Sequence, residues 1–128
     1  MITMNSARTP VAEQLLRGLA AGDERLLRAV LAVPPARMWA HRASLIQPLP
    51  PATCALVHLA GLLAAGGSTT SLRWAVELAF DAGTGDEEIV EVLTTVAPTV
   101  GAARVVAAAP RLALAIGYDI EVEGWDGT

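Results

Sequence analysis

The sequence lacks lysine and contains only one cysteine and two histidines. The single cysteine, Cys54, excludes an internal disulfide and a redox centre made of two cysteines of this chain. The absence of lysine excludes Schiff-base catalysis on a lysine and the lysine of a phosphate-binding loop. With so few thiols and imidazoles, a zinc site is not expected. We therefore predict neither a metal nor a cofactor.

Long apolar runs are missing as well. A membrane-spanning helix needs roughly 18 uninterrupted apolar residues. The longest candidate, residues 55–65, is shorter than this and contains His58. The first residues do not combine a charged region with an apolar run, so a signal peptide is not expected. These observations predict a cytoplasmic protein without a membrane partner.

What the chain does contain is a large share of apolar side chains and an excess of acids. Of its 128 residues, 53% are hydrophobic, and the mean hydropathy is +0.46. One domain of this size cannot bury so much apolar surface, so we expect it to self-associate. The net charge is −4, with seven arginines in residues 1–76 and ten acids in residues 77–128. Net acidity without a basic patch argues against nucleic-acid binding.

Helical patterns recur along the chain and strand patterns do not, which predicts an all-α fold. Caps and stops place helices at about 9–21, 23–33, 36–46, 51–65, 68–81, 84–98 and 100–116. Thr84 and Glu87 match a capping box, and Pro110 is expected to kink or split the last helix. We predict a disordered leader over 1–8, a single all-α domain over 9–118 and an acidic tail over 119–128.

The strongest local signal is the segment 66–88. Its first two residues are glycines that end one helix, and Ser68 is suited to cap the next. The apolar residues of that next helix recur at helical spacing and form one stripe: Leu72, Ala75, Val76 and Ala79. Arg73 and Glu77 stand four residues apart, a spacing at which an ion pair contributes only a few tenths of a kcal/mol.

Five stretches in this order form a wider pattern: Leu49-Pro50-Pro51, residues 73–79 (RWAVELA), Ala82-Gly83, residues 86–89 (DEEI) and residues 96–106 (VAPTVGAARVV). The pattern resembles the carboxymuconolactone decarboxylase and alkylhydroperoxidase D-like superfamily. The resemblance implies a carboxymuconolactone decarboxylase-like helical bundle, with 49–118 as the family-like core and 9–48 as an N-terminal helical extension. It also implies assembly into a homotrimer or hexamer.

The redox members of that family carry C-x-x-C-x-x-x-H at the start of the central helix. The spacing puts all three side chains on one helix face, where the thiols react and the histidine relays protons. The matching positions here are Ser68, Ser71 and Ala75. The resemblance therefore implies a divergent member that lacks the redox motif.

The extension contains three candidate site residues. Trp39 and Arg42 have the spacing to stack as a cation–π pair at the rim of a pocket. His41 points to a different side of the same predicted helix and is a candidate catalytic residue. The alternative is a helix that packs Trp39 or Met38 in the core and leaves His41 and Arg42 in solvent.

Further candidates lie on the central helix. Ser71 is the second catalytic candidate, because it would line the family's cavity. Ser68 either lines the same cavity or caps the helix. Trp74 and Arg73 are candidate ligand-binding residues, and Arg73 has the alternative of pairing with Glu77.

Two further residues stand outside these groups. His58 is a candidate ligand-binding residue, and with Cys54 at i and i+4 it forms either a nucleophilic dyad or an unrelated pair. Arg104, in the last matching stretch, is expected to make a structural contact across a helix or a subunit interface.

Three functions are consistent with these residues. The first is a cofactor-free enzyme of the decarboxylase, isomerase or cyclase type that acts on a small organic molecule in a helix-lined pocket. The second is a non-catalytic oligomer that binds a small molecule or serves as a scaffold. The third, thiol-dependent peroxide reduction, is the least favoured because the thiol pair is missing.

Overall fold

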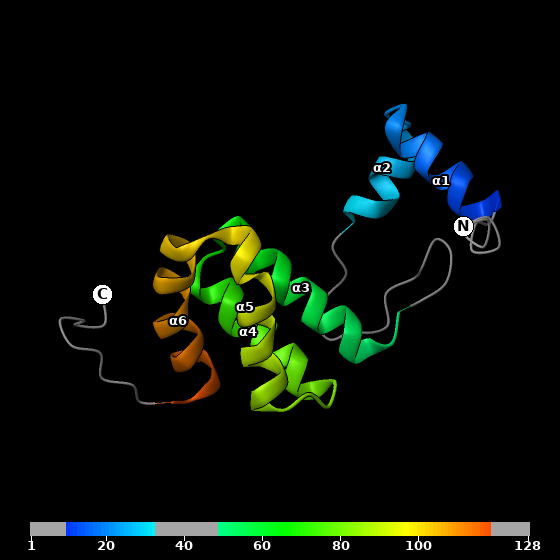
Figure 1. The fold of residues 1–128 in the computed structure, drawn as a ribbon. Helices are drawn as coiled ribbons and strands as arrows, with labels where there is room; N and C mark the ends of the chain where they lie inside the picture. Colours follow the sequence, from blue (N-terminus) through cyan, green and yellow to red (C-terminus); the bar gives the residue numbers. More distant parts are fainter. Residues whose placement is uncertain (1–9, 33–48, 119–128) are drawn as a thin grey trace, which may run out of the picture. The chain divides into compact units, whose positions relative to one another are not determined.

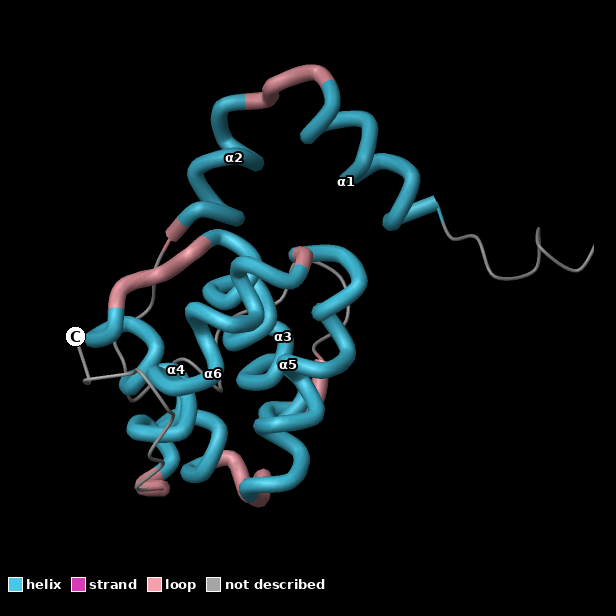
Figure 2. Tube along the Cα trace, turned by 60° about the vertical axis from the view of Figure 1, so that its left-hand side comes forward, coloured by secondary structure: helices cyan, strands magenta, loops and turns pink. Residues whose placement is uncertain are grey.

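The computed structural model describes residues 10–32 and 49–118, and helices make up both stretches (Figure 1). Only turns and short loops join the helices of these stretches, and neither contains a strand (Figure 2). The predicted all-α class is therefore confirmed for the described residues. The chain divides into two compact units, Met1–Pro48 and Leu49–Thr128, which are described separately below.

Three sequence-based predictions lie outside the described residues. These are the leader at 1–8, the helix at 36–46 and the acidic tail at 119–128. Within the described stretches, no helix is both long enough and apolar enough to cross a membrane.

The first unit contains α1 (Pro10–Ala20) and α2 (Glu24–Leu31). Pro10 begins α1, at a position where the missing N–H would have no helical partner in any case. Asp23 caps α2 as predicted, because its Oδ1 accepts hydrogen bonds from the backbone N–H groups that open the helix.

The apolar stripes of α1 and α2 are only partly covered. Neither helix contains a buried residue, and Leu31 is 71% exposed. The described part of this unit therefore has no closed hydrophobic core of its own.

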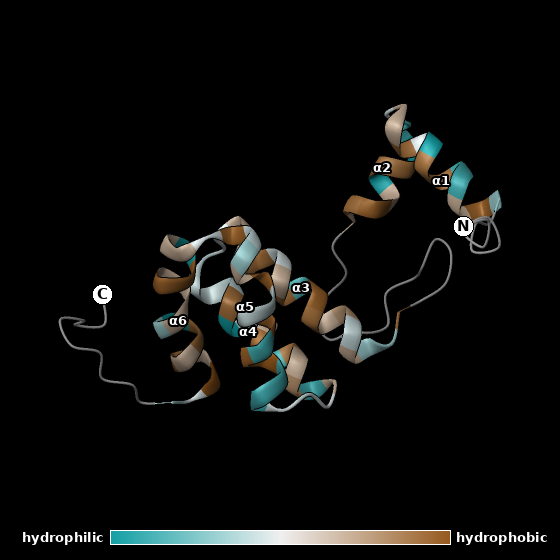
Figure 3. Cartoon of the chain, viewed as in Figure 1, coloured by the Kyte–Doolittle hydropathy of each residue, from teal (hydrophilic) through white to brown (hydrophobic). Residues whose placement is uncertain are grey.

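The second unit contains four helices: α3 (Pro51–Ala65), α4 (Thr69–Asp81), α5 (Asp86–Val100) and α6 (Ala102–Ile116). Helices α3 and α6 each pack against both α4 and α5, and they also touch one another. Apolar residues recur along all four (Figure 3). The core that they bury comprises Ala55, Leu59, Leu63, Leu72, Ala75, Val76, Ala79, Ile89, Leu93, Ala108 and Leu112. The stripe predicted on the central helix is thus confirmed as the contribution of α4.

The turn between α3 and α4 follows the sequence prediction closely. Gly66 ends α3 in the left-handed conformation, with φ +74° and ψ +42°. Its N–H and that of Gly67 both donate to the carbonyl oxygen of Leu62. Ser68 then caps α4, because its Oγ accepts a hydrogen bond from the backbone N–H of Ser71 at 3.1 Å.

The capping box predicted for Thr84 and Glu87 is wrong by one residue. The N-cap of α5 is Gly85, and its N–H donates to Oε1 of Glu88 at 3.1 Å. Thr84 is buried and donates its hydroxyl to the carbonyl oxygen of Ala79 at 2.8 Å. The hydroxyl of Thr84 therefore closes the end of α4, and α5 is capped one residue later, at Gly85.

The sequence predicts that one helix ends at Pro98 and that Pro110 kinks or splits the next, but both helices continue past their proline. Helix α5 continues past Pro98 to Val100, and α6 runs unsplit through Pro110. The break between α5 and α6 occurs instead at Gly101, whose φ of +91° favours glycine. A proline costs about 3 kcal/mol inside a helix. In α6, buried side chains on either side of Pro110 offset this cost.

The end of α6 is tied to the start of α5. The hydroxyl of Tyr118 donates to Oδ2 of Asp86 at 2.8 Å. This hydrogen bond, followed by the negative charge of Asp86, raises the pKa of Tyr118 above its ordinary value. The contact links the residues that follow α6 to the first turn of α5.

Candidate functional site

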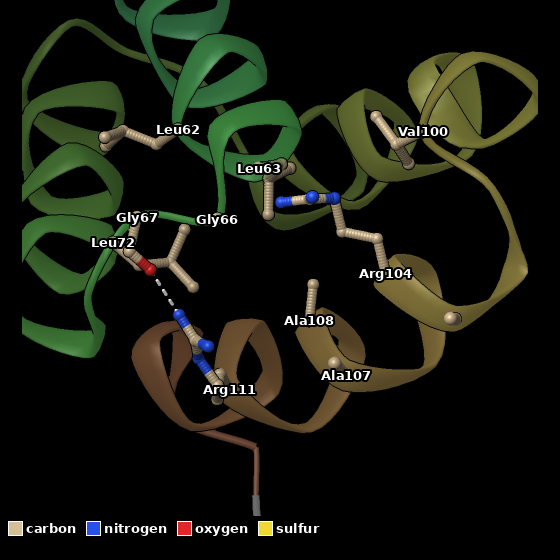
Figure 4. Close-up of a pocket in the computed structure, with 11 residues that line it drawn as sticks. Leu62, Leu63, Gly66, Gly67, Leu72, Val100, Arg104, Ala107, Ala108 and Arg111 are labelled. Carbon is tan, nitrogen blue, oxygen red and sulfur yellow. Dashed lines mark hydrogen bonds between the residues drawn. The ribbon is translucent and has the colours of Figure 1, made fainter.

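A cavity of about 480 Å³ lies where the end of α3 and the start of α4 face α6 (Figure 4). Its wall is mostly apolar side chains and bare backbone, with two arginines from α6. The lining residues are Leu62, Leu63, Gly66, Gly67, Leu72, Val100, Ala103, Arg104, Ala107, Ala108 and Arg111. Pockets that bind small molecules are typically roughly 300–1,000 Å³ and mainly apolar, with a few placed polar groups. This cavity has those properties.

The glycine turn forms one wall, where an added side chain would displace its neighbours. A Cβ atom on Gly66 would lie 2.6 Å from Nη1 of Arg104, and one on Gly67 would lie 2.9 Å from Cδ2 of Leu62. Both distances are shorter than carbon and nitrogen atoms tolerate without displacement. The absence of a side chain leaves room for the guanidinium of Arg104 at Gly66 and for the side chain of Leu62 at Gly67.

Arg111 stands two turns further along α6 and points at the same wall (Figure 4). Its Nη2 donates to the carbonyl oxygen of Gly67, and so joins α6 to the α3–α4 turn. Its Nε is buried and has no acceptor among the described residues. A buried donor without an acceptor costs about 1–3 kcal/mol. Arg111 therefore has a structural contact and also an unsatisfied donor at the edge of the cavity.

The lining of the cavity carries two positive charges and no negative one. The acids on the described helices of the second unit are elsewhere, on α4 and α5: Glu77, Asp81, Asp86, Glu87, Glu88 and Glu91. In the described part of the chain, an ion pair joins Arg17 to Glu13, and neither cavity arginine has a carboxylate partner. The carbonyl end of α3 carries a partial negative charge, which offsets only part of the positive charge of the two arginines. The cavity is therefore suited to an anionic group.

A second hollow, of about 410 Å³, lies between α3 and α5. Its lining residues are Thr53, Leu56, Val57, Ala60, Glu88, Glu91, Val92, Thr95 and Val96. It is apolar with two carboxylates and contains no cation. None of the site residues predicted from the sequence is among its lining residues.

The predicted catalytic residue Ser71 is hydrogen-bonded to Ser68. Oγ of Ser68 donates to Oγ of Ser71 at 3.0 Å, in addition to accepting from the backbone of Ser71. The two hydroxyls thus form a local helix cap. Neither serine is among the lining residues of the two cavities.

The structure brings together two residues that the sequence analysis treated separately. His58 on α3 and Trp74 on α4 meet edge to face, with ring centroids 5.7 Å apart and planes at 88°. Both are partly buried, and burial lowers the pKa of His58. The nearby thiol of Cys54 donates to the carbonyl oxygen of Leu49 at 3.7 Å.

The other predicted residues take no part in this contact where the structure describes them. Arg73 is exposed on α4, and the described residues show no ion pair between it and Glu77. Trp39, His41 and Arg42 lie outside the described residues. Across the described ranges, histidine, cysteine and acidic side chains do not gather in a group of three that could hold a metal ion.

Arg104 and Arg111 line one cavity, which the sequence does not predict. The sequence predicts a structural contact for Arg104 and no specific role for Arg111. The available signal was their spacing of seven residues, which places both on one face of a helix rich in alanine. The opposing glycine turn could not be inferred from that spacing.

A search of protein-family models, of curated proteins and of solved structures gives no match to this chain. The resemblance to the carboxymuconolactone decarboxylase superfamily therefore stays a prediction. The all-α class of the described residues is established independently of that resemblance.

Proposed function

We propose that this protein binds a small organic molecule in the cavity between the α3–α4 turn and α6, without converting it there. One observation carries the proposal. An apolar cavity of about 480 Å³ is interrupted by two guanidinium groups, those of Arg104 and Arg111. Apolar walls supply binding free energy, and the few polar groups orient the ligand.

The chemistry of the lining residues favours binding over catalysis. Apart from the two arginines, the lining consists of leucine, valine, alanine and glycine. Arginine stays protonated at any physiological pH, so it donates hydrogen bonds but does not transfer protons. A reaction in this cavity would lack a general base, a general acid and a nucleophile from its own wall.

A cofactor-free enzyme of the decarboxylase, isomerase or cyclase type is the second candidate. The contact between His58 and Trp74 is the observation that favours it. Because burial lowers the pKa of His58, its imidazole is neutral near pH 7 and can accept a proton. In this proposal the substrate lies against Trp74 and His58 is the general base.

Two broader proposals concern family and assembly. We propose that the chain is a divergent member of the carboxymuconolactone decarboxylase superfamily, on the order of its motifs over residues 49–118. We also propose that it self-associates. Large apolar side chains on the described surface of the second unit support association, among them Val57 at 56% and Val106 at 71% exposure.

Filling the cavity tests the binding proposal. In Ala107→Phe the new ring occupies the space beside Arg104, whereas in Ala109→Phe it lies on the exposed side of α6, outside the lining. A panel of small organic molecules is screened by the rise in melting temperature that binding produces. Ligands that stabilise the wild type should also stabilise Ala109→Phe but not Ala107→Phe. Equal stabilisation of both variants would contradict the proposed site.

A further inference from the structure

We infer that the ligand of this cavity is an organic monocarboxylate with an apolar body, and that Arg104 binds its carboxylate group. This inference rests on the proposed function and specifies its ligand.

Arg104 is the cavity's available cation. Its side chain extends from α6 toward the glycine turn, and it has no hydrogen bond or ion pair with any described residue (Figure 4). The residue is exposed, so a ligand can reach its guanidinium. Arginine presents two parallel N–H donors in a planar fork that matches the two oxygens of a carboxylate.

Arg111 has a different role, because it is already engaged. Its hydrogen bond to the carbonyl oxygen of Gly67 anchors α6 against the turn, and its Nε is buried. It adds positive potential to the cavity and holds the wall that faces Arg104. Arg111 is therefore a positioning residue. The guanidinium of Arg104 alone remains to bind a carboxylate group of the ligand.

The surroundings favour a single negative charge over a double one. The carbonyl end of α3 at Gly66 forms the wall beside Arg104, and its partial negative charge opposes a dianion. Phosphate groups are usually held instead by backbone N–H groups at helix starts or glycine-rich loops. In this turn the N–H groups of Gly66 and Gly67 both donate to Leu62, so they are not available to a phosphate.

The rest of the lining selects the body of the ligand. Leucines 62, 63 and 72 and the alanines of α6 present apolar surface, and no side-chain hydroxyl or amide belongs to the lining. A polar body would lose its hydrogen bonds to water without replacement. An aliphatic or aromatic body attached to the carboxylate would instead bury apolar surface against these side chains.

Matched ligands test the inference. Octanoate and octanamide have the same shape, but only octanoate is charged. Acetate has the charge without the body, and octyl phosphate has the body with a larger negative charge. Isothermal titration calorimetry on the full-length protein should show octanoate binding at least about tenfold tighter than each of the other three compounds.

Variants test the role of Arg104. Arg104→Gln should weaken octanoate binding about 10- to 100-fold and leave octanamide binding almost unchanged. Arg104→Lys keeps the charge without the planar fork, so it should recover only part of the affinity. The control is Arg73→Gln, which removes an exposed arginine outside the cavity and should bind octanoate as the wild type does. Circular dichroism confirms that each variant is folded.

The outcomes separate the inference from the proposed function. If octanoate and octanamide bind equally well, the cavity binds small molecules but the carboxylate assignment is wrong. If octyl phosphate binds tightest, the ligand class is a phosphate ester instead. If Arg104→Gln and Arg73→Gln have the same effect, Arg104 does not bind the anion. If none of the compounds binds, the carboxylate inference fails, and the proposed function is decided by the ligand panel with Ala107→Phe and Ala109→Phe.

Discussion

The guanidinium of Arg104 lies against the backbone of Gly66, where a Cβ atom would come within 2.6 Å of Nη1. The same glycine has a φ of +74°, in the left-handed region that side chains disfavour. One position thus meets two requirements, the end of α3 and space for the cavity's cation. The turn between α3 and α4 and the candidate binding site are parts of one arrangement.

Replacement of Gly66 should therefore have two effects. In Gly66→Ala the left-handed backbone costs about 1–2 kcal/mol of stability, and the new methyl group displaces Arg104. We expect a lower urea midpoint and weaker octanoate binding. Gly83→Ala is the control, because Gly83 also has a positive φ, +95°, but no atom lies within 4 Å of its Cβ position. Gly83→Ala should lower the urea midpoint and leave the affinity for octanoate unchanged. An unchanged octanoate affinity in Gly66→Ala would contradict the coupling.

Tyr118 should ionise at an unusually high pH. It is the chain's only tyrosine, so the ultraviolet absorbance of phenolate reports it alone. Its hydrogen bond to Asp86 favours the protonated phenol and raises its pKa above the ordinary value of 10.0. The stabilisation that this bond provides is complete below pH 10.0 and is lost as the pH rises through the raised pKa.

Substitution of the acceptor tests the cause of that shift. Asp86→Ala should return the tyrosine titration toward pH 10.0. Glu87→Gln should have a smaller effect, because the charge of Glu87 is the least of the contributions. If the two variants titrate like the wild type, the hydrogen bond is not formed in solution.

His58 should titrate in the opposite direction. Burial against Trp74 disfavours the charged imidazole and lowers its pKa below the ordinary value of 6.5. The unfolded chain then binds the proton more readily than the folded one. Stability should therefore be complete above pH 6.5 and decline as the pH falls toward the lowered pKa.

Nuclear magnetic resonance of the imidazole protons measures this pKa directly. His41→Gln leaves His58 as the only histidine and so assigns the signal. The slope of stability between pH 5 and pH 7 should disappear in His58→Gln if His58 causes it. A His58 pKa at or above 6.5 would show that the imidazole is solvated, and would remove the observation that favours the enzyme.

Self-association should be measurable as a mass of three or six chains. Light scattering at micromolar concentration should give a multiple of the 13.3 kDa chain mass. Val106 is 71% exposed on α6, so a charge there should weaken a contact made by this face. We expect Val106→Glu to lower the mass and Thr99→Glu, at an exposed polar residue, to leave it unchanged. A wild-type mass of one chain would contradict the proposed assembly.

Helix starts and stops were often predictable because they depend on neighbouring residues. Gly66, Ser68 and Asp23 act at the helix ends where the sequence predicts them. The predictions failed where another contact or the packing of the helix competed. Thr84 binds the carbonyl of Ala79 instead of capping α5, and α6 runs unsplit through Pro110 because packing holds both sides.

The sequence by itself determined the all-α class, the bounds of α3 and α4 and the buried stripe of α4, because capping and helical periodicity act over about four residues. It also determined that Arg104 and Arg111 share a helix face. Only the tertiary structure decided what that face meets. The contact between Arg111 and Gly67 joins residues 44 apart in the chain, and its formation depends on how four helices pack together. The cavity and its charge arise from that packing, and no local pattern specifies them.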